Sequence, residues 1–298
     1  MSTQWLFYKI RLGQFPDAAD PLIRDEFSQF RAIAGVEQWF FIRYVDEQDG
    51  FHLRLRLKVQ AENAAPVRQQ VESRLDQLMP LVPILAAQST PRQSLTGRRP
   101  QYQYRAMTPA WQLAEYEPEL EKFGHGEALE VAHRWFEQSA DLTVAALWLD
   151  QQAVGVRNAL AYLFTRTVCE VFQPTPSPAR FLQNYSYTWL PRNLVQINNF
   201  RKQFFRDALQ RLEQGQSLVP EADDWPQATT QLLAQWRQTL QQTQQQLRQL
   251  GFRHAFIQQQ AWQCIHLMNN RLGISPFEES YLATQLEAWY REEARDVA

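Results

Sequence analysis

Residues 36–58 constrain the fold more than any other stretch, because they have the pattern of a β-hairpin. Two runs rich in aromatic and branched residues, 36–45 and 51–58, flank a short polar stretch that ends in Asp-Gly. A polar loop of this kind between two such runs is typical of a hairpin turn. The second run alternates strictly between apolar and polar residues, which predicts a strand with one apolar face and one polar face.

The polar face of this second strand carries four basic residues, His52, Arg54, Arg56 and Lys58. Side chains two positions apart on a strand lie about 6.7 Å apart, so Arg54 and Arg56 can hold the two ends of one small anion. If the two strands pair, Arg43 of the first run is expected near the same row. A solvated strand face has the same pattern, and this stretch alone does not decide between an anion site and an ordinary surface.

The rest of the chain predicts a small sheet followed by helices. Residues 4–12 have a strand pattern, 102–105 are expected to return to the sheet, and apolar residues recur at helical spacing elsewhere. The expected helices are 16–33, 64–85, 125–149, 154–172, 190–214, 225–250, 253–272 and 277–295, with a loop at 88–100 and a proline-rich linker at 173–179. This order predicts an α+β fold. We expect one domain over 1–298, strand-rich over 1–110 and mainly helical over 111–298.

Composition and charge limit the classes of function. The 298 residues include 30 Lys and Arg against 32 Asp and Glu, and this balance gives no general reason to expect nucleic acid or an anionic membrane as a partner. No apolar run is long enough to span a bilayer, and residues 1–14 lack the apolar core of a signal peptide. Cys169 and Cys264 form no pair motif, and the five histidines have no metal-ligand spacing. We therefore expect a reduced, cytoplasmic protein with no metal and no cofactor.

Two further stretches carry side chains suited to chemistry. Residues 116–126 form a charged turn into a helix and include Lys122. A later helix places His266 and Asn270 four positions apart on one face. Arg271, the next residue, is suited either to binding a ligand or to stabilising the C-terminus of the helix. A lone helical histidine is more often structural than functional. The paired carboxylates that follow, at 278–279, are expected at a solvated helix end.

Taken in order, these three stretches resemble the thiopeptide-type bacteriocin biosynthesis domain. That domain is the C-terminal elimination domain of class I lantibiotic dehydratases and also occurs as a free-standing protein. The resemblance rests on the runs 39–44 (Trp-Phe-Phe-Ile-Arg-Tyr), 52–56 (His-Leu-Arg-Leu-Arg), 116–125 and 266–272 (His-Leu-Met-Asn-Asn-Arg-Leu), with support from 5–9 and 135–139. It covers nearly the whole chain.

The resemblance implies an activity on ribosomally made precursor peptides. In that family a separate domain or protein first glutamylates Ser or Thr from glutamyl-tRNA, and the elimination domain then removes the glutamate to leave dehydroalanine or dehydrobutyrine. This chain would be a split elimination enzyme, a carbon–oxygen lyase. Its implied partners are a precursor peptide and a separate tRNA-dependent glutamylating protein, without membrane or direct nucleic-acid binding, and a homodimer is left open.

The resemblance also implies roles for individual residues. Arg56 would be the main contact of the glutamyl group and the oxyanion, with Arg54 in support. His266 would carry the proton, because an imidazole titrates near neutral pH whereas a guanidinium stays charged. The other residues expected to bind substrate are Arg43, Lys122, Asn270 and Arg271.

The chain departs from the family pattern within 116–125. Lys122 stands where the family has arginine, Phe123 where it has tyrosine, and His125 where it has a second glycine. Lysine keeps the charge but loses the two-pronged fork of a guanidinium.

Two other interpretations therefore stay open. One is a pyridine-forming [4+2] cyclase of thiopeptide biosynthesis on the same fold; it has no glutamate to hold, so Arg54, Arg56 and His266 favour elimination. The other is a non-catalytic subunit that binds the precursor peptide by strand addition at a free edge such as 4–12.

Overall fold

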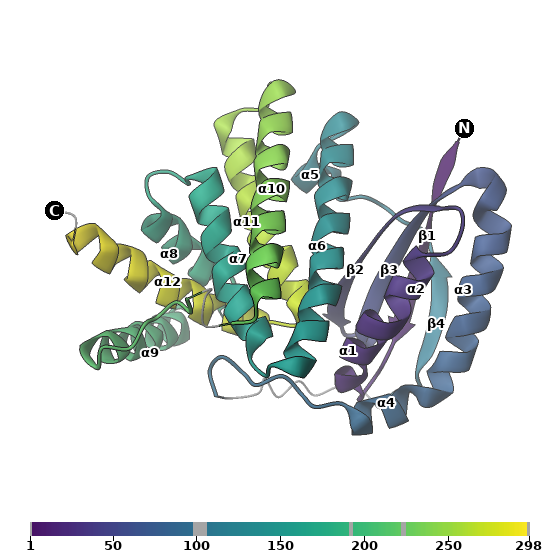
Figure 1. Cartoon of the computed structure of the whole chain (residues 1–298), viewed down its shortest axis with the longest axis horizontal. Coiled ribbons are helices and arrows are strands. Elements are labelled where there is room, and N and C mark those ends of the chain that lie inside the picture. Colours follow the sequence, from purple (N-terminus) through teal and green to yellow (C-terminus); the bar gives the residue numbers. More distant parts are fainter. Residues whose placement is uncertain (1, 98–105, 191–192, 222–224, 297–298) are drawn as a thin grey trace. The chain divides into compact units, whose positions relative to one another are not determined.

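The computed structural model describes residues 2–97, 106–190, 193–221 and 225–296. The chain forms two compact units. The sheet unit comprises Met1–Arg92 and Gln101–Trp148, and the helical unit comprises Gln93–Pro100 and Leu149–Ala298. Figure 1 shows the strands and helices of each unit. Antiparallel strands near the N-terminus and a larger helical C-terminal part confirm the predicted α+β class.

A four-stranded antiparallel sheet organises the sheet unit. Its strands are β1 (Thr3–Arg11), β2 (Val36–Asp46), β3 (Gly50–Gln60) and β4 (Ala110–Ala114), in the spatial order β2-β3-β1-β4. β2 and β3 form the predicted hairpin. The expected return to the sheet at 102–105 lies outside the described residues, and the fourth described strand begins at Ala110.

One face of the sheet is apolar and lies under helices. The leucines of β3 at 53, 55 and 57 are fully buried, as their alternation predicts. Phe27 of the helical segment 16–31 contacts Phe41 of β2 at a ring distance of 5.8 Å. The longer helix α3 (Ala64–Leu78) buries a stripe with helical spacing, consisting of Ala64, Val67, Val71, Leu75 and Leu78. Full burial of one such aliphatic side chain stabilises the fold by roughly 1.5–3 kcal/mol.

The other face of the sheet carries the basic row and packs against α6 (Glu127–Gln152). The ring of Phe40 on β2 lies 5.0 Å from the ring of Phe136, and Lys58 on β3 donates to the carboxylate of Glu130 at 3.0 Å. The basic row is therefore part of a packed interface within the sheet unit and is not a freely solvated strand face.

β1 is an inner strand and not a free edge. It pairs with β3 from Thr3 to Arg11 and with β4 from Phe7 to Arg11. The expectation that 4–12 offers an open edge to a peptide is therefore wrong from Phe7 onwards. The edge strands among the described residues are β2 and β4.

Among its described residues the helical unit has six long helices, which follow most of the predicted spans. They are α7 (Val156–Phe172), α8 (Pro178–Thr188), α9 (Leu194–Glu213), α10 (Gln227–Gln249), α11 (His254–Leu272) and α12 (Pro276–Asp296). α7 packs against α10 and α11, and α12 packs against α8 and α9. In the part of the chain that the structure describes, no helix is both long enough and apolar enough to cross a bilayer.

The other helical segments of the described residues are shorter. They are η1 (Pro16–Ala18), α1 (Ala19–Pro21), η2 (Leu22–Phe27), α2 (Ser28–Arg31), η3 (Ala61–Asn63), η4 (Met79–Leu81), α4 (Val82–Gln88) and α5 (Leu120–Phe123). The predicted linker 173–179 is wrong at its end, because α8 begins within it. The hydroxyl of Ser177 accepts from the backbone N–H of Arg180 at 3.2 Å, and Pro178 occupies the first helical position, where its missing N–H costs nothing.

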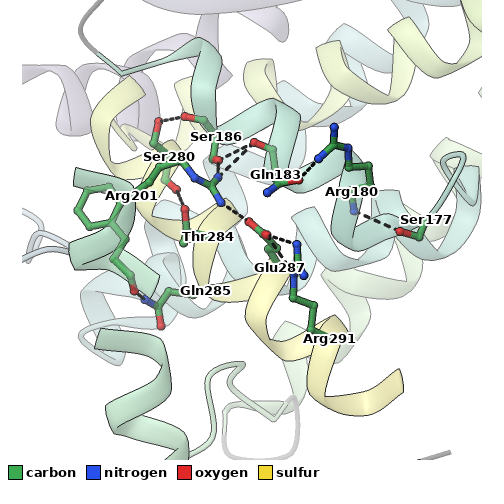
Figure 2. A network of polar contacts seen from close by, with 11 residues as sticks. Ser177, Arg180, Gln183, Ser186, Arg201, Ser280, Thr284, Gln285, Glu287 and Arg291 are labelled. Atoms are coloured by element: carbon green, nitrogen blue, oxygen red, sulfur yellow. Dashed lines mark hydrogen bonds and ion pairs between the residues drawn. The ribbon is translucent and has the colours of Figure 1, made fainter. Parts of the chain in front are cut away.

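A buried polar network ties three helices of the helical unit together (Figure 2). Arg201 of α9 donates to the carboxylate of Glu287 of α12 at 2.7 Å and to Ser186 of α8. Glu287 is almost wholly buried and also pairs with Arg291 at 2.8 Å. Because both members of the central pair are buried, each depends on the other for compensation of its charge.

Replacing Glu287 with alanine is therefore expected to destabilise the protein by about 3–5 kcal/mol, because it leaves the Arg201 guanidinium buried without its carboxylate. The matched control is Glu292→Ala, which removes an exposed ion pair with Arg295 and is expected to change stability by at most about 0.5 kcal/mol. Denaturant unfolding of both variants measures the difference. Equal stability of the two variants would show that the buried network does not hold the three helices.

Candidate functional site

The basic row has a precise position within the sheet unit. In the register of β1 and β3, Arg56 lies opposite Phe7, and Arg54 lies opposite Lys9. Residues opposite each other in antiparallel strands point to the same face of the sheet. The sheet thus brings Arg54 and Arg56 together on one face, as the alternation predicts.

Arg56 lies in an aromatic cage. Its guanidinium carbon is 4.6 Å from the ring centroid of Phe7 and 5.2 Å from those of Phe40 and Tyr116, at distances suited to cation–π attraction. Only 8% of the residue is exposed, and its buried Nε has no hydrogen-bond partner. Among the described residues no carboxylate forms an ion pair with Arg56.

Burial lowers the pKa of Arg56 to about 10, because the charged form loses water. The nearby charge of Arg54 acts in the same direction, whereas Tyr116 and Glu119 act against it. At neutral pH the guanidinium still carries its charge. A buried cation with an unused donor is a site where an anionic ligand gains much, because charge pairing is strong away from water.

A tyrosine–histidine pair stands beside this cage. The hydroxyl of Tyr116 lies 3.0 Å from Nε2 of His133 on α6. Burial raises the pKa of Tyr116 to about 12 and lowers the pKa of His133 to about 4, so both are neutral near pH 7. The pair therefore borders the Arg56 guanidinium and adds no charge near it at pH 7. Sequence reasoning missed His133; the family-like turn at 116–125 was the signal for Tyr116.

Arg54 is held at the hairpin end by a second set of contacts. Its Nε donates to Nε2 of His52 at 3.0 Å, so the other ring nitrogen, Nδ1, carries the hydrogen and donates to the carbonyl of Gly50 at 3.0 Å. Burial lowers the pKa of His52, which keeps this imidazole neutral. The guanidinium also lies 3.5 Å from Asp46 and 3.5 Å from the centroid of the Tyr44 ring. These contacts fix the orientation of Arg54 beside Arg56.

Ligand atoms of Asp46, Asp49 and His52 lie within 4.8 Å of one another, a grouping that a metal ion can use. Each group is already engaged, however. Lys9 and Arg11 pair with Asp49 at 3.2 and 3.5 Å, and both nitrogens of His52 hold hydrogen bonds. Three cations, Lys9, Arg11 and Arg54, around two carboxylates fit an ion-pair cluster better than a metal site.

Two other predicted residues of the sheet unit have ion-pair partners of their own. Lys122 on α5 is half exposed and pairs with Glu119 one turn earlier. Arg43 lies opposite Leu53 in the hairpin register and pairs with Asp20 at 2.6 Å, on the apolar face of the sheet. The expectation that Arg43 lies near Arg54 and Arg56 is wrong, because register decides the face and a shift of one residue reverses it.

His266 is the centre of a second cluster, in the helical unit. Its Nδ1 lies 3.0 and 3.3 Å from the two carboxylate oxygens of Glu279 on α12. The hydroxyl of Tyr185 on α8 donates to the same carboxylate. The imidazole stacks on Trp189, with ring centroids 4.1 Å apart and planes 17° apart.

This arrangement sets the tautomer of His266. A carboxylate on Nδ1 holds the hydrogen there and leaves the lone pair on Nε2. Among the described residues none hydrogen-bonds Nε2, and the side chain keeps 21% of its surface exposed. Burial raises the pKa of Glu279, while the bonds from His266 and Tyr185 favour its charged form. An imidazole held in this way is suited to accept a proton at Nε2.

The expectation that 278–279 is a solvated helix end is wrong, because both glutamates are about 1% exposed. Glu278 accepts from the backbone N–H groups of Leu95 and Ser275 at 2.9 and 3.0 Å, and Glu279 holds His266. Sequence reasoning therefore missed Glu279, which follows a proline that starts a helix and has the pattern of an ordinary acidic first turn.

Asn270 and Arg271 have different surroundings. Asn270 is half-buried, one turn after His266 on α11. Arg271 is fully enclosed, with no exposed surface, near the end of α11. Its position at the last turn of the helix suits a cation that stabilises the helix C-terminus.

A family model described as "Lantibiotic biosynthesis dehydratase C-term" matches residues 5–290. No curated protein matches the sequence. Three solved structures share the fold at low identity: the tRNA-dependent lantibiotic dehydratase MibB from Microbispora sp. 107891 (18% identity, TM-score 0.68), the pyridine synthase TbtD from thiomuracin biosynthesis (17%, 0.65) and TsrL (15%, 0.60).

The three structures differ in how much of their own length this chain matches. This chain is covered over 98–99% in all three, but it spans only 28% of the length of MibB, against 100% of TbtD and 96% of TsrL. Because the family match extends over nearly the entire sequence, this chain belongs to the family of lantibiotic biosynthesis dehydratase C-terminal domains.

Proposed function

We propose that this protein removes glutamate from glutamylated Ser or Thr residues of a ribosomally made precursor peptide. The observation that carries the proposal is Arg56, a caged, buried guanidinium with an unused donor and no ion-pair partner among the described residues. The glutamyl group supplies the carboxylate that such a cation binds. The family match supports a role in the dehydration of peptides.

The reaction is a β-elimination. His266 takes the α-proton of the modified residue at Nε2, while the Cβ–O bond breaks. The electron pair of the Cα–H bond forms the Cα–Cβ double bond, and the pair of the Cβ–O bond leaves with the carboxylate of glutamate. Dehydroalanine forms from Ser and dehydrobutyrine from Thr. No cofactor is required, because the leaving carboxylate is already a stable anion.

Arg56 contributes electrostatic stabilisation in this proposal. It holds the glutamyl group and offsets the negative charge that grows as the proton is removed. The contacts with His52 and Asp46 prevent Arg54 from turning away, so it adds a second positive charge on the same sheet face. Glu279 keeps Nε2 of His266 free of hydrogen and stabilises the imidazolium that forms.

The proposal requires two partners. One is the precursor peptide, and the other is a glutamylating protein that acts before this one, because the elimination needs a glutamyl ester as its substrate. Mass spectrometry of a candidate precursor treated with the glutamylating partner, with and without this protein, tests the proposal. Dehydrated residues are expected only when this protein is present. Glutamyl adducts that persist unchanged in its presence would contradict it.

Lys122→Arg is expected to retain activity within about threefold, because the exposed Lys122 ammonium supplies positive charge rather than a fixed fork. Steady-state glutamate release measures the effect, and Lys122→Glu serves as the charge-reversed comparison with an expected loss of about tenfold or more. An inactive Lys122→Arg variant would mean that the region around 116–125 has been rebuilt for another ligand.

A [4+2] pyridine-forming cyclase is the second candidate function. The observation that favours it is the match to TbtD, which covers 99% of this chain and 100% of that one. A peptide that already contains two dehydroalanines separates the two functions, because a cyclase converts it and an elimination enzyme leaves it unchanged.

A further inference from the structure

A hollow on the helical unit lies on the same helix as His266. It has a volume of about 430 Å³ and is lined by Phe181 of α8 and by Ala255, Gln258, Gln259, Trp262 and Gln263 of α11. Pockets of roughly 300–1,000 Å³ are the usual size of small-ligand sites in proteins.

The chemistry of the lining is that of a peptide site. It combines two aromatic rings with the uncharged amides of three glutamines and contains no charged side chain. The Oε1 of Gln258 accepts from the backbone N–H of Thr175 at 3.3 Å, while its Nε2 is buried and has no partner. An unused amide donor in this mixed lining matches a backbone carbonyl, because an unsatisfied buried donor is costly.

The hollow lies one helical turn from His266. Trp262 is four residues before His266 on α11, so both lie on one face of the helix. The ring of Trp262 lies 4.7 Å from the ring of Tyr185, which in turn lies 6.2 Å from that of Trp189, on which His266 stacks. A row of aromatic rings therefore leads from the hollow to the imidazole.

We propose that this hollow binds an uncharged segment of the precursor peptide, a few residues from the residue that undergoes elimination. Gln259 and His266 are seven residues apart, which is about 10 Å along a helix axis. An extended peptide covers this distance in about three residues. The glutamine amides bind the peptide backbone, and Phe181 and Trp262 contact an apolar side chain. This inference rests on the proposed function for the identity of the ligand.

Binding of two synthetic peptides tests the inference without any need for turnover. Both carry a central 2,3-diaminopropionate whose side-chain amine bears a glutamyl group through a stable amide. One is a fluorescein-labelled nonapeptide of Ala, Leu and Ser, and the other is a tripeptide that is too short to reach the hollow. Fluorescence anisotropy with the full chain is expected to show at least tenfold tighter binding of the nonapeptide.

Ala255→Phe fills the hollow from an exposed helical position and is expected to weaken nonapeptide binding about tenfold, to the level of the tripeptide. It should leave tripeptide binding unchanged. The control is Ala87→Phe at an exposed position of α4, where neither peptide should lose affinity. Equal affinity of the two peptides for the wild type, full binding of the nonapeptide by Ala255→Phe, or no binding of either peptide would overturn the inference.

The ester forms of the same peptides separate this inference from the proposed function. If only the hollow is misassigned, the wild type still releases glutamate from both esters, and Ala255→Phe does so equally well. If only the elimination is misassigned, the nonapeptide amide still binds in a manner sensitive to Ala255→Phe, but no ester loses glutamate.

Discussion

Replacing Arg56 or His266 with alanine is expected to stop the pathway after glutamylation, so that precursor peptide with intact glutamyl esters accumulates. Removal of a positioned base typically slows a reaction by about 10²–10⁴-fold. Removal of one preorganised stabilising charge typically costs about 10²–10³-fold. Mass spectrometry of peptide treated with the glutamylating partner and each variant measures the accumulation.

The sheet offers a matched control for the arginine. Arg43 lies on the same hairpin but on its opposite face, where it pairs with Asp20. Arg43→Ala removes an equal charge and an equal volume, and it is expected to leave elimination per folded molecule unchanged. Arg56→Lys adds a second comparison, since lysine keeps the charge but not the planar fork that stacks on the rings. Normal dehydration by both alanine variants would remove the elimination hypothesis.

Glu279→Gln is expected to lower the rate constant for elimination by about 10²–10⁴-fold while leaving peptide affinity nearly unchanged. An amide can donate its N–H to Nδ1 of His266, which moves the imidazole hydrogen to Nε2 and removes the lone pair that accepts the proton. Glu279 is therefore a positioning residue. Single-turnover glutamate release, followed as a function of pH, separates this effect from a loss of folded protein.

The neighbouring glutamate provides the control for Glu279. Glu278 is equally buried, but it binds backbone N–H groups of Leu95 and Ser275 and not the imidazole. Glu278→Gln is expected to lower the melting temperature and to keep the elimination rate of the molecules that remain folded. Full activity of Glu279→Gln, or an equal loss in both variants, would contradict the role assigned to Glu279.

Local patterns predict much of this fold, because they depend on residues that are close in the sequence. The alternation in 51–58 predicts which β3 side chains lie on the apolar face of the sheet and which form the basic row. Helical spacing locates most of the long helices to within a few residues. Ser177 and Pro178 are typical of a helix N-terminus and indicate the start of α8. The three prolines of this stretch are also typical of a linker, which is why a linker is predicted there.

Features that depend on tertiary structure could not be predicted in the same way. The face of the sheet on which Arg43 lies depends on the hairpin register. The sequence of one strand does not show which residue of the partner strand lies opposite, and a shift of one residue reverses the face. The order of the sheet makes β1 an inner strand through its pairing with β4, roughly 100 residues later in the chain.

The candidate site likewise combines residues that local sequence patterns predict with residues whose roles depend on tertiary structure. The sequence singles out Arg54, Arg56 and His266, because their residue types and spacing are unusual and resemble a family pattern. It does not single out Glu279 or His133, because their roles come from burial against other elements. A glutamate in the first turn of a helix looks the same in sequence whether it is solvated or holds a buried imidazole.

We propose above all that this protein eliminates glutamate with formation of a carbon–carbon double bond. The most direct test is to incubate the purified protein with a peptide that carries one chemically prepared glutamyl ester on serine, and to quantify free glutamate and the peptide product together. The account predicts one dehydroalanine for each glutamate released. Release of glutamate with recovery of serine, or no release at all, would contradict it.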